Sequence, residues 1–563
     1  MTARKRRPER GAAERKQMVM FTRFPPYIVQ LLSALTAAGQ EAYVVGGAVR
    51  DLLLGLTPGD YDVTTSARPE QVCEIAGRNG WKVVDKLGRN MGVVVVVVDG
   101  HGVEVATFRG ERYRTDVHRP AEVWFCDNLQ DDLSRRDFTV NAMAMDLAGR
   151  IYDYYGGRQD LKRRVLRTVG DPRRRYAEDA LRMYRACRFV AQLDFTYVED
   201  GDTPDGVRWD YDPAQPLADN LRRGAAEAAA FEAETGMPYG FGMPGTPYFL
   251  RKRYVFDTSR CRELSLERVR TELEKMLTAK AAGKGLMLYV ATGLSDCSCR
   301  IREGGRDTCV PVLPELRHLV NLHQNPRYHC YDVWEHTLQA VDNGPRDLIL
   351  RWALLLHDAA KGLPGVRGVN KEGQPSDHGH EKESAELAQG IFSRLGYARP
   401  FVKRAVWLIA NHMRFAPMLI AKKNTLYRWV RSEAASGRFR NEAELAEAYA
   451  QVAAVFLADM GATWSGIRQD PVLDDGRALA REVVHIAAAE MPVHTGDLAL
   501  SGSDVQGLLP PQSPLTVGEA LQYLLRRVQS GGAANDAEPL KELLRRKLDR
   551  ELQKGGTEDA PHA

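Results

Sequence analysis

Apolar positions in the first quarter of the chain alternate between two periods, which predicts short strands separated by helices. Residues 28–35 repeat apolar side chains at helical spacing, whereas residues 42–45 form a short apolar run that leads into two glycines. The longest apolar run, residues 93–98, consists of valines, and a further strand is expected at residues 103–108. The pattern predicts an α/β unit with a small mixed sheet, in a chain that is α+β as a whole.

Farther along, from Tyr176, the apolar period becomes helical. One stretch interrupts it: residues 199–256 are rich in Gly, Pro, Asp and Ala, and we interpret them as an insertion, part surface loop and part short helix around residues 222–234. We expect a disordered basic arm (residues 1–22), a head (23–170) and a helical neck that contains the insertion (171–317). These are followed by a histidine-rich helical domain (318–465), a helical C-terminal body and tail (466–553) and a disordered end (554–563).

Composition narrows the class of protein without identifying a partner. A hydrophobic content of 44% and a charged content of 27% are those of a soluble globular protein, and no apolar stretch is long enough to span a bilayer. The net charge of +4 means that a basic surface would need local clustering. Eight scattered cysteines do not form a disulfide framework, and Cys297, Cys299 and Cys309 fall short of a zinc pattern. We therefore expect free thiols, a cytoplasmic location and no membrane partner.

Two aspartates separated by one residue, Asp60 and Asp62, accompany a second expected strand at residues 61–64. Side chains at i and i+2 of a strand point to the same face, so both carboxylates would project into one site. Adjacent negative charges are costly unless a cation neutralises them, and Mg²⁺ is a hard, oxygen-preferring ion that suits them. Considered alone, the pair is explained more simply as solvated turn carboxylates after Pro58-Gly59.

The segment before this pair has the residues of a phosphate-binding turn. The strand at residues 42–45 runs into Gly46-Gly47, and a helix is expected to open there with Arg50 one turn in. Glycines let backbone N–H groups approach phosphate oxygens closely, and a helix N-terminus favours an anion. By itself, a Gly-Gly turn is weak evidence for such a site.

Several of these features occur in one order along the chain. After the glycines come Arg50-Asp51, Leu54-Gly55, Asp60 and Asp62, and later the block Arg-Arg-Asp-Phe-Thr-Val-Asn-Ala at residues 135–142. In this order the chain resembles the bacterial and eukaryotic (class II) CCA-adding enzymes and poly(A) polymerases, of the polymerase β nucleotidyltransferase superfamily. The resemblance implies a catalytic head with a small mixed sheet, followed by all-α domains.

The resemblance also implies roles for individual residues. Asp60 and Asp62 would hold the catalytic Mg²⁺, and contacts to the nucleotide would come from Gly46, Gly47, Arg50 and Arg136. Glu104 stands where a third carboxylate could help, but a salt-bridged strand residue fits as well, so we leave it out of the predicted site. Residues 111–120 match the flexible loop that separates the two halves of the family's catalytic domain.

A second block, residues 176–189, is expected to be helical and to carry a polar stripe of Asp179, Arg182 and Arg185, with Arg188 flanking it. By spacing alone, an ion pair on a solvated helix is the simpler interpretation. The resemblance implies instead that Asp179 and the arginines present an acceptor and donors to the Watson–Crick edge of the incoming base, which selects C and A over G and U. Protein side chains would then replace a template strand. Residues 264–273 also match a family helix, which we interpret as structural support.

Most of the chain's histidines lie in its third region, beside acidic residues. Imidazoles and carboxylates on successive helices suit a transition-metal site, and an adjacent His-Asp pair supplies two ligands from one turn. The pair at 357–358, followed by Lys361, resembles the HD phosphohydrolase signature. The expected ligands of a second divalent metal are His336, His357, Asp358 and Asp459, with His380 and His412 as secondary candidates. Phosphohydrolase activity of this domain is left open.

The chain is therefore expected to be a CCA tRNA nucleotidyltransferase. The tRNA 3′-hydroxyl would attack the α-phosphate of CTP or ATP, and pyrophosphate would leave. Residues 491–505 look like the C-terminal element of the family's HD-bearing members, and residues 518–528 and 540–548 would grip tRNA phosphates, although solvated charged helices explain them too.

Several alternatives remain at this point. The shared motifs do not separate full CCA addition from poly(A), CC-only or A-only addition. From other classes, the alternatives are a phosphohydrolase whose head only docks RNA and a non-enzymatic tRNA-binding protein. The role of the insertion and the oligomeric state are open.

Overall fold

The computed structural model describes residues 24–84, 91–112, 122–199, 201–202, 211–252, 254–463 and 469–555. The predicted arm at residues 1–22, nearly all of the predicted loop at 111–120 and the chain end beyond 555 lie outside the described residues. Two compact units are present: residues 1–212 with 221–317, and residues 213–220 with 318–563.

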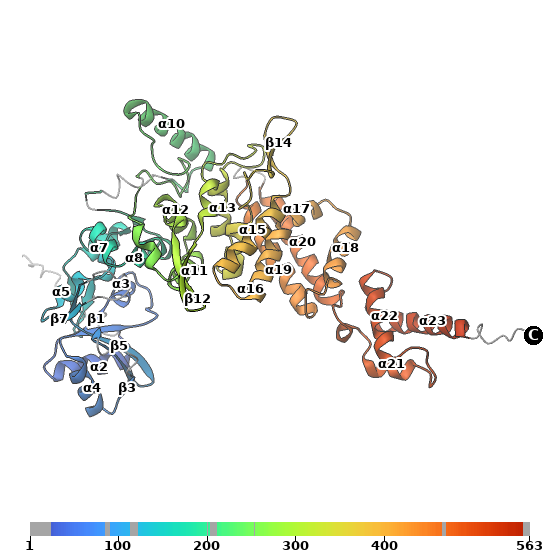
Figure 1. Ribbon diagram of the computed structural model, residues 1–563, viewed down its shortest axis with the longest axis horizontal. Helices are drawn as coiled ribbons and strands as arrows, with labels where there is room; N and C mark the ends of the chain where they lie inside the picture. The colour runs from blue at the N-terminus through green and yellow to red at the C-terminus, as the bar shows by residue number, and fades with distance from the viewer. Residues whose placement is uncertain are drawn as a thin grey trace, which may run out of the picture. The chain divides into compact units, whose positions relative to one another are not determined.

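The first unit is built on a seven-stranded mixed sheet with the strand order β3-β4-β5-β2-β1-β8-β9. Figure 1 labels β1, β3 and β5 of this sheet. Strands β2 and β5 run parallel, while the other neighbours are antiparallel. This confirms the small mixed sheet expected for the head. The strand bounds are Ala42–Val45 (β1), Asp62–Thr65 (β2), Lys82–Val84 (β3), Val93–Val98 (β4), His101–Thr107 (β5), Met143–Met145 (β8) and Ile151–Asp153 (β9).

Helices α2 (Pro26–Ala37) and α4 (Pro69–Arg78) cover one face of this sheet. The alternating valines of β4 explain why: Val94, Val96 and Val98 are buried, whereas the valines between them are half-buried. By register, the opposite face carries Asp62 of β2 and Glu104 of β5. The sheet thus separates an apolar, helix-covered face from a face that presents carboxylates.

Shorter elements complete the head. These are α3 (Gly47–Leu53), the hairpin β6 (Arg109–Arg112) and β7 (Glu122–Phe125), α5 (Leu129–Ser134), the 3₁₀ turn η2 (Thr139–Asn141), α6 (Gly157–Arg163) and the strand β10 (Val165–Leu166), which pairs with β11 (Thr196–Tyr197).

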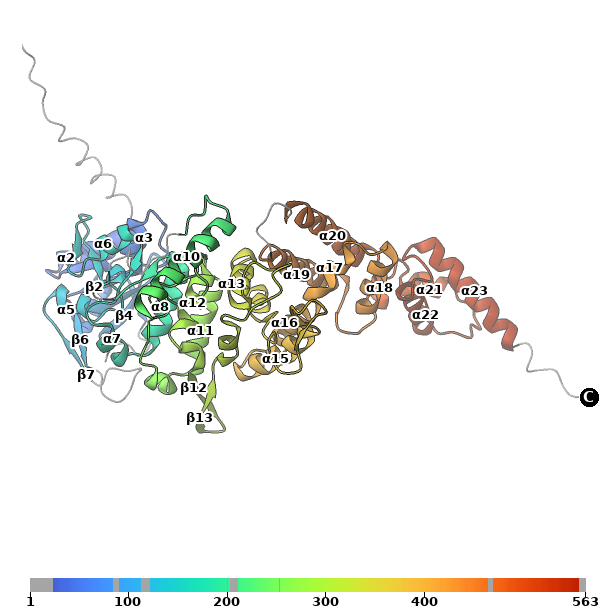
Figure 2. The same cartoon turned by 90° about the horizontal axis from the view of Figure 1, so that it is seen from above.

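The neck is helical, and α8 (Leu181–Leu193) lies at its centre. It packs against α7 (Pro172–Glu178), α11 (Leu266–Leu277) and α12 (Ala282–Ala291) (Figure 2). Gly285 allows α12 to approach α8 closely, because a Cβ there would lie 2.6 Å from the Cys187 carbonyl oxygen. The three-cysteine segment forms a hairpin, β12 (Ser298–Glu303) and β13 (Arg306–Pro311), and its thiols are free, as expected.

The insertion contains a helix, α10 (Leu217–Thr235), which is longer than the short helix we expected. Contacts between the two ends of the insertion hold them together: Asp202 accepts hydrogen bonds from the Lys252 ammonium at 2.9 Å and the Tyr254 hydroxyl at 3.2 Å. The insertion is therefore a segment whose first and last residues lie close together.

The second unit is almost entirely helical, with one small hairpin of β14 (Arg367–Val369) and β15 (Pro375–Asp377). Its central helix is α14 (Leu348–Leu356), whose residues 350–356 are all buried. The helices around it are α13 (Val333–Asn343), α15 (His380–Arg394), α16 (Arg399–Asn411), α17 (Phe415–Met418), α18 (Lys423–Ala434), α19 (Glu442–Met460) and α20 (Gln469–Ala489).

The last three helices, α21 (Gly502–Leu508), α22 (Val517–Gln529) and α23 (Ala537–Gly555), enclose a separate apolar core that includes Leu500, Leu524 and Leu544. Helix α20 packs along α19 instead, so this core begins later than the predicted boundary at residue 466. No helix in the described part of the chain has the length and apolarity needed to cross a membrane.

Two candidate active sites

In the first site, a strand runs into a glycine turn that opens a helix. Strand β1 ends at Val45, Gly46 has φ 77°, and α3 begins at Gly47. A side chain at Gly46 would be strained, and its Cβ would also lie 3.0 Å from Nη1 of Arg136. Glycine is therefore required by the backbone conformation and by the adjacent guanidinium, and the arrangement brings Arg136 to the turn.

Asp62 is the first residue of β2 and pairs with Val45. Burial and the charges of Asp60 and Glu104, opposed by the charge of Arg136, together raise the pKa of Asp62 to about 6. Asp60 precedes the strand, so the prediction that both aspartates share one strand is wrong, although their charges do act on each other. Clustered carboxylates with this excess of negative charge fit a divalent cation.

A further carboxylate, which contacts the same face of the sheet as Asp62, was not foreseen. Asp132 of α5 is fully buried and accepts hydrogen bonds from the Thr64 hydroxyl at 3.0 Å and from Arg135 at 2.8 Å. Its Oδ2 also lies 3.9 Å from Nη2 of Arg136. Asp132 therefore helps to hold Arg136 beside the glycine turn. The sequence signal was only a carboxylate four residues before Arg136, which is common on helices.

Arg50 is oriented by other residues of the same motifs. Its Nη1 donates to Oδ1 of Asn141 at 2.7 Å, and its Nε donates to Asp51 at 2.9 Å. Asn141 in turn donates to Asp137 at 3.2 Å. The Gly-Gly-Arg motif and the block at residues 135–142 thus form one hydrogen-bonded network, although Arg50 and Asn141 are 91 positions apart.

The base-selecting block differs from the expected continuous helix. At Asp179 the backbone is extended, with φ −145° and ψ 105°, so α7 ends at Glu178 and α8 begins at Leu181. The Asp179 carboxylate accepts a hydrogen bond from the backbone N–H of Leu181 at 3.0 Å. Aspartate competes with helical hydrogen bonding in this way, which explains the break. The structure therefore places Asp179 at a helix junction, and the prediction of a single helical stripe is wrong for it.

The three arginines of α8 each have an acidic partner. Arg182 lies 3.0 Å from Glu178 and donates to the Arg135 carbonyl at 2.9 Å. Arg185 donates through two nitrogens to Asp137, at 2.6 and 2.9 Å, and Arg188 lies 2.6 Å from Glu272 of α11. These pairs hold the guanidinium groups in defined positions, and they link α8 to the head.

Asp137 illustrates the strength of that link. Burial alone would raise the pKa of its carboxyl, but the charge and hydrogen bonds of Arg185 outweigh burial and hold the pKa well below its usual range. The carboxylate is therefore charged at neutral pH, and loss of Arg185 would leave a buried charge without its main partner.

The second site gathers six residues that the chain supplies from several helices. His336 comes from α13, His357 and Asp358 follow α14, His380 begins α15, His412 follows α16, and Asp459 comes from α19; all are buried. The structure therefore brings together the four expected ligands and both secondary candidates. His357 and Asp358, adjacent in the sequence, directly follow the buried helix α14.

The four imidazoles have a common orientation. In each of them Nδ1 faces a backbone carbonyl oxygen, at 2.7 Å for His357, His380 and His412 and at 3.2 Å for His336. Nδ1 then carries the proton, because a carbonyl oxygen only accepts. In this tautomer Nε2 presents its lone pair, the form in which histidine binds a metal. For His357, burial lowers the pKa but the neighbouring Asp358 and Asp459 carboxylates outweigh it and raise the pKa to about 9, so metal binding at Nε2 would displace a proton.

The ligand atoms fall into two groups, each with its atoms within 4.8 Å: His336, His357 and Asp459, and Asp358, His380 and His412. Asp358 connects the groups. Its Oδ1 lies 3.0 Å from Nε2 of His380, and its Oδ2 lies 3.3 Å from Nε2 of His357. Two sets of neutral nitrogen and carboxylate donors that share one carboxylate fit one or two divalent cations.

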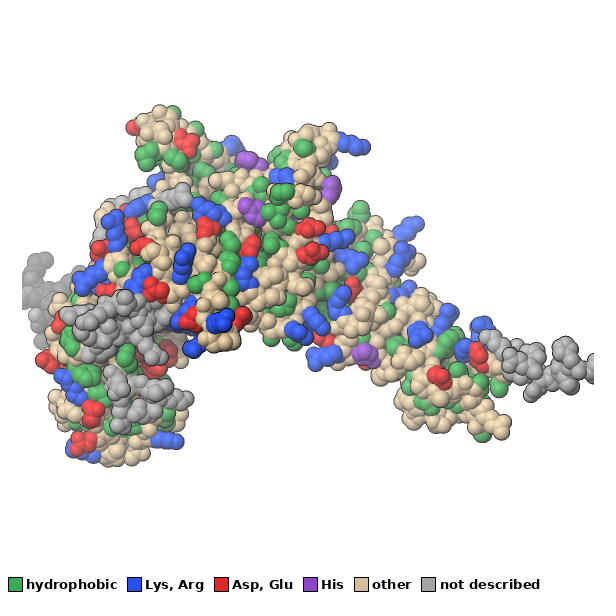
Figure 3. All heavy atoms as spheres, viewed as in Figure 1, with side chains coloured by type: hydrophobic (Ala, Val, Ile, Leu, Met, Phe, Trp, Pro, Cys, Tyr) green, Lys and Arg blue, Asp and Glu red, His purple; other side chains and the backbone are tan. Residues whose placement is uncertain are grey.

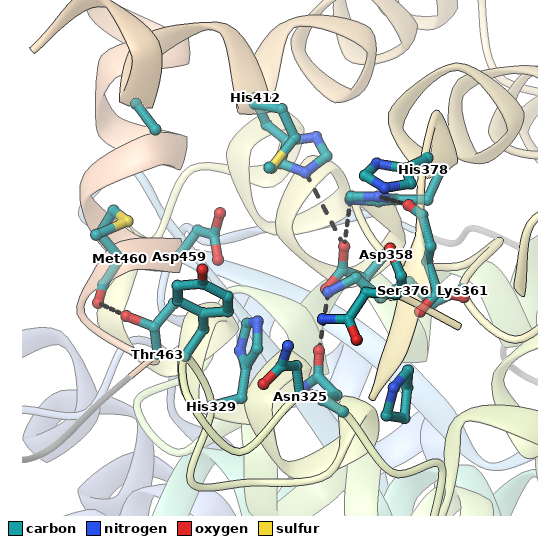
Figure 4. Close-up of a pocket in the computed structure, with 18 of the residues that line it drawn as sticks. Asn325, His329, Asp358, Lys361, Ser376, His378, His412, Asp459, Met460 and Thr463 are labelled. Carbon is teal, nitrogen blue, oxygen red and sulfur yellow. Dashed lines mark hydrogen bonds and ion pairs between the residues drawn. The ribbon is translucent and has the colours of Figure 1, made fainter. Parts of the chain in front are cut away.

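An open cavity of about 600 Å³ leads to this cluster (Figure 4). Asp358, Asp459 and His412 face it from the protein side, and Lys361, whose ammonium lies 2.7 Å from Asp358, lines its wall. His329 and His378 also line the cavity, and sequence reasoning did not include them in the site. Neither histidine belongs to the adjacent His-Asp pair that indicated the site, which is why they were left out.

On the face of the molecule shown in Figure 3, Lys and Arg side chains are intermixed with Asp and Glu side chains. The small net charge of +4 agrees with such mixing.

Comparison with known proteins matches both sites to families. Residues 42–167 match the poly A polymerase head domain, and residues 327–456 match the HD domain. The CCA-adding enzyme of Bacillus pumilus is 49% identical over 169 residues, 30% of this chain and 41% of that protein. That of Bacillus licheniformis is 37% identical over 264 residues, 47% of this chain and 53% of that protein.

The chain thus spans about half the length of the curated relatives it matches. Among solved structures, the Bacillus stearothermophilus CCA-adding enzyme in complex with CTP superposes with a TM-score of 0.54 at 25% identity, covering 94% of this chain and 100% of that chain.

Proposed function

We propose that this chain, which combines a poly(A) polymerase head domain with an HD domain, is a CCA-adding tRNA nucleotidyltransferase that uses CTP and ATP. The observation that carries the proposal is the hydrogen-bonded network that links Arg50 through Asn141 and Asp137 to Arg185 of α8. The charges of Asp60 and Asp62 act on each other and on Arg136, which lies at the glycine turn of the same site. The names of the Bacillus relatives support the same activity. We further propose that the enzyme acts in the cytoplasm.

In the proposed reaction, the tRNA 3′-hydroxyl attacks the α-phosphate of the nucleotide and pyrophosphate leaves. Asp60 and Asp62 would hold the Mg²⁺ that, when bound, activates the hydroxyl and stabilises charge on the phosphate. Arg50, Arg136 and the N–H groups of the glycine turn bind the triphosphate. Asp179, at the junction of α7 and α8, would accept a hydrogen bond from the exocyclic amine of C or A, with Arg182 as the donor.

The products distinguish this activity from its relatives. A tRNA that lacks its 3′ end should gain two C residues and one A when given CTP and ATP together, and only C residues when given CTP alone. Product lengths are read at single-nucleotide resolution. A long A tract would contradict the proposal in favour of a poly(A) polymerase, and extension by C only or by A only would favour the restricted enzymes.

Substitutions in the head can test the alternative that it docks RNA without catalysing nucleotide transfer. If the head only docked RNA, Asp60 and Asp62 could be replaced without loss. We expect Asp60→Ala and Asp62→Ala each to lower incorporation by about 10³-fold or more, because each removes charge stabilisation that is specific to the transition state. tRNA binding should stay within about twofold of the unsubstituted protein, as phosphate contacts elsewhere supply it.

A second activity is supported by the geometry of the HD domain. The Nε2 lone pairs of four histidines converge on Asp358 and Asp459, and a cavity gives access to them. We propose that this cluster binds divalent transition metal and supports phosphohydrolase activity. Metal analysis of protein purified without chelator, and hydrolysis of a generic phosphodiester with Mn²⁺, Co²⁺ or Ni²⁺, test this. Protein that takes up none of these metals at the cluster would refute it.

A further inference from the structure

An aromatic ring lies among the arginines of the first site. Phe189, on α8, is 6% exposed, and the guanidinium carbons of Arg50, Arg185 and Arg188 lie 5.4, 5.4 and 4.1 Å from its ring centroid. All three distances are within the range of cation–π attraction. One neutral side chain is therefore shared by three cations, one from the head and two from the neck.

The three guanidinium groups repel one another, so their gathering needs an explanation. Burial lowers the pKa of Arg188, and the nearby charges of Arg185 and Arg50 lower it further while Glu272 opposes them. Each arginine has one acidic partner: Asp51 for Arg50, Asp137 for Arg185 and Glu272 for Arg188. The negative face of the Phe189 ring adds an attraction that all three arginines share.

A second aromatic ring holds Phe189 in place. Phe138, in the block at residues 135–142, meets it edge-on, with ring centroids 5.6 Å apart and planes at 77°. Phe138 is fully buried, and it directly follows Asp137, the partner of Arg185. The same short segment of the head therefore fixes both the ring and one of the cations beside it.

We propose that Phe189 is a positioning residue, which holds Arg50, Arg185 and Arg188 as one preformed group for the incoming nucleotide. A carboxylate in its place would add a fourth negative charge to three arginines that already have one carboxylate partner each. An aliphatic side chain would fill the space but leave the repulsion unrelieved. An aromatic ring attracts the cations without adding a further negative charge, so the group stays able to bind the nucleotide.

This inference rests on the proposed nucleotidyltransferase function, and it concerns nucleotide affinity in particular. Phe189→Leu keeps an apolar, helix-compatible side chain and removes only the aromatic face. Cation–π contributions of this size predict that the Kd of CTP and ATP and their KM rise about 5- to 30-fold, with kcat at saturation within about twofold. Phe189→Tyr retains the ring face and should stay within about twofold of the unsubstituted protein in all three quantities.

Phe195 provides a matched control. It is also buried, follows the same helix, and has one arginine, Arg164, at 5.6 Å from its ring centroid, but none of the three nucleotide-site arginines. Phe195→Leu therefore removes a comparable ring and a comparable cation–π contact. Nucleotide Kd should be unchanged in this variant, even if its melting temperature falls.

The experiment measures nucleotide Kd by equilibrium dialysis with Mg²⁺, primer-extension kinetics and melting temperature for all four proteins. A selective rise in Kd and KM for Phe189→Leu, absent from Phe189→Tyr and Phe195→Leu, supports the inference. An unchanged Kd in Phe189→Leu, or an equal rise in Phe189→Tyr or Phe195→Leu, overturns it. If the unsubstituted protein binds CTP but extends no primer, the proposed function fails, while the Kd comparison still decides the role of Phe189.

Discussion

Replacing Asp62 by asparagine should stabilise the head while abolishing nucleotide transfer. Asp62 lies on the carboxylate face of the sheet, where burial and the charges of Asp60 and Glu104 raise its pKa from the ordinary 3.8 to about 6. The folded state is thus penalised for keeping this carboxylate charged. An asparagine at this position would have nearly the same shape and no charge, so the variant would be relieved of that penalty.

The magnitude follows from the pKa. A rise from 3.8 to about 6 corresponds to about 3 kcal/mol of differential stability between the charged and neutral forms. Because the side chain is partly open to solvent, we expect about 1–3 kcal/mol, which corresponds to an increase in the melting temperature of about 2–6 °C.

The pH dependence has a defined sign. Between pH 3.8 and about 6 the folded state binds more protons at Asp62 than the unfolded state does, so rising pH destabilises the protein across this window. The penalty is fully present above about pH 6 and absent below about pH 4. The difference in unfolding free energy between Asp62→Asn and the unsubstituted protein should therefore grow from about pH 4.5 to about pH 6.5 and then stay constant.

Thermal unfolding followed by circular dichroism, with EDTA and with Mg²⁺, provides the assay. Mg²⁺ should raise the melting temperature of the unsubstituted protein and narrow its difference from the variant, because a bound cation neutralises the same charge. Asp127→Asn is the control, since the Asp127 side chain is 98% exposed and its replacement should leave stability within about 0.5 kcal/mol. If Asp62→Asn is no more stable than the unsubstituted protein at about pH 8 in EDTA, the electrostatic reasoning is refuted.

Three further predictions concern other parts of the molecule. Gly46→Ala should lower nucleotide incorporation by about 10-fold or more and reduce the free energy of unfolding by about 1–2 kcal/mol. The reason is that φ is 77° at this residue and the new Cβ would press on Arg136. Gly59→Ala is the control in the same assays, because no atom lies within 4 Å of the Cβ it would add. Arg185→Gln should lower the free energy of unfolding, measured in urea, by about 2–4 kcal/mol, because it leaves Asp137 charged and buried. The double variant Arg185→Gln with Asp137→Asn should recover at least half of that loss. A double variant as unstable as the single one would contradict the pairing. Asp358→Ala should reduce the amount of bound transition metal, measured by elemental analysis, more than His336→Ala or His380→Ala does. The reason is that Asp358 contacts both ligand groups. Equal losses of metal in the three variants would argue against a shared carboxylate.

Much of the first site follows from short stretches of sequence. An apolar strand followed by two glycines predicts the turn and the helix, because β-branched runs favour strands and a positive φ favours glycine. The pairing of Asp60 with Asp62 was likewise recognisable from spacing, although only Asp62 is on the strand. Adjacent His357 and Asp358 indicated the second site in the same local way.

Other features depend on contacts between distant parts of the chain. Asp132 meets Thr64 across 68 positions, Asp137 meets Arg185 across 48, and the Nδ1 atom of His336 faces the carbonyl of a residue 126 positions away. The apolar period of a single helix or strand carries no information about contacts between residues so far apart in the sequence. The helix break at Asp179 has a local cause: its carboxylate accepts a hydrogen bond from the Leu181 N–H, which competes with helical hydrogen bonding. The apolar period of the sequence is the same for a broken helix and a continuous one, so it does not reveal the break.

The sequence by itself therefore determined the kinds of element and the chemical types gathered in each motif: carboxylates after a glycine turn, arginines on a helix, and histidines beside aspartates. Only the tertiary structure decided which of these groups meet, how each imidazole is turned, and that one phenylalanine lies among three arginines. The physical reason is that residue type and spacing set local conformation, whereas packing of the sheet and the helices sets the distances over which charges and hydrogen bonds act.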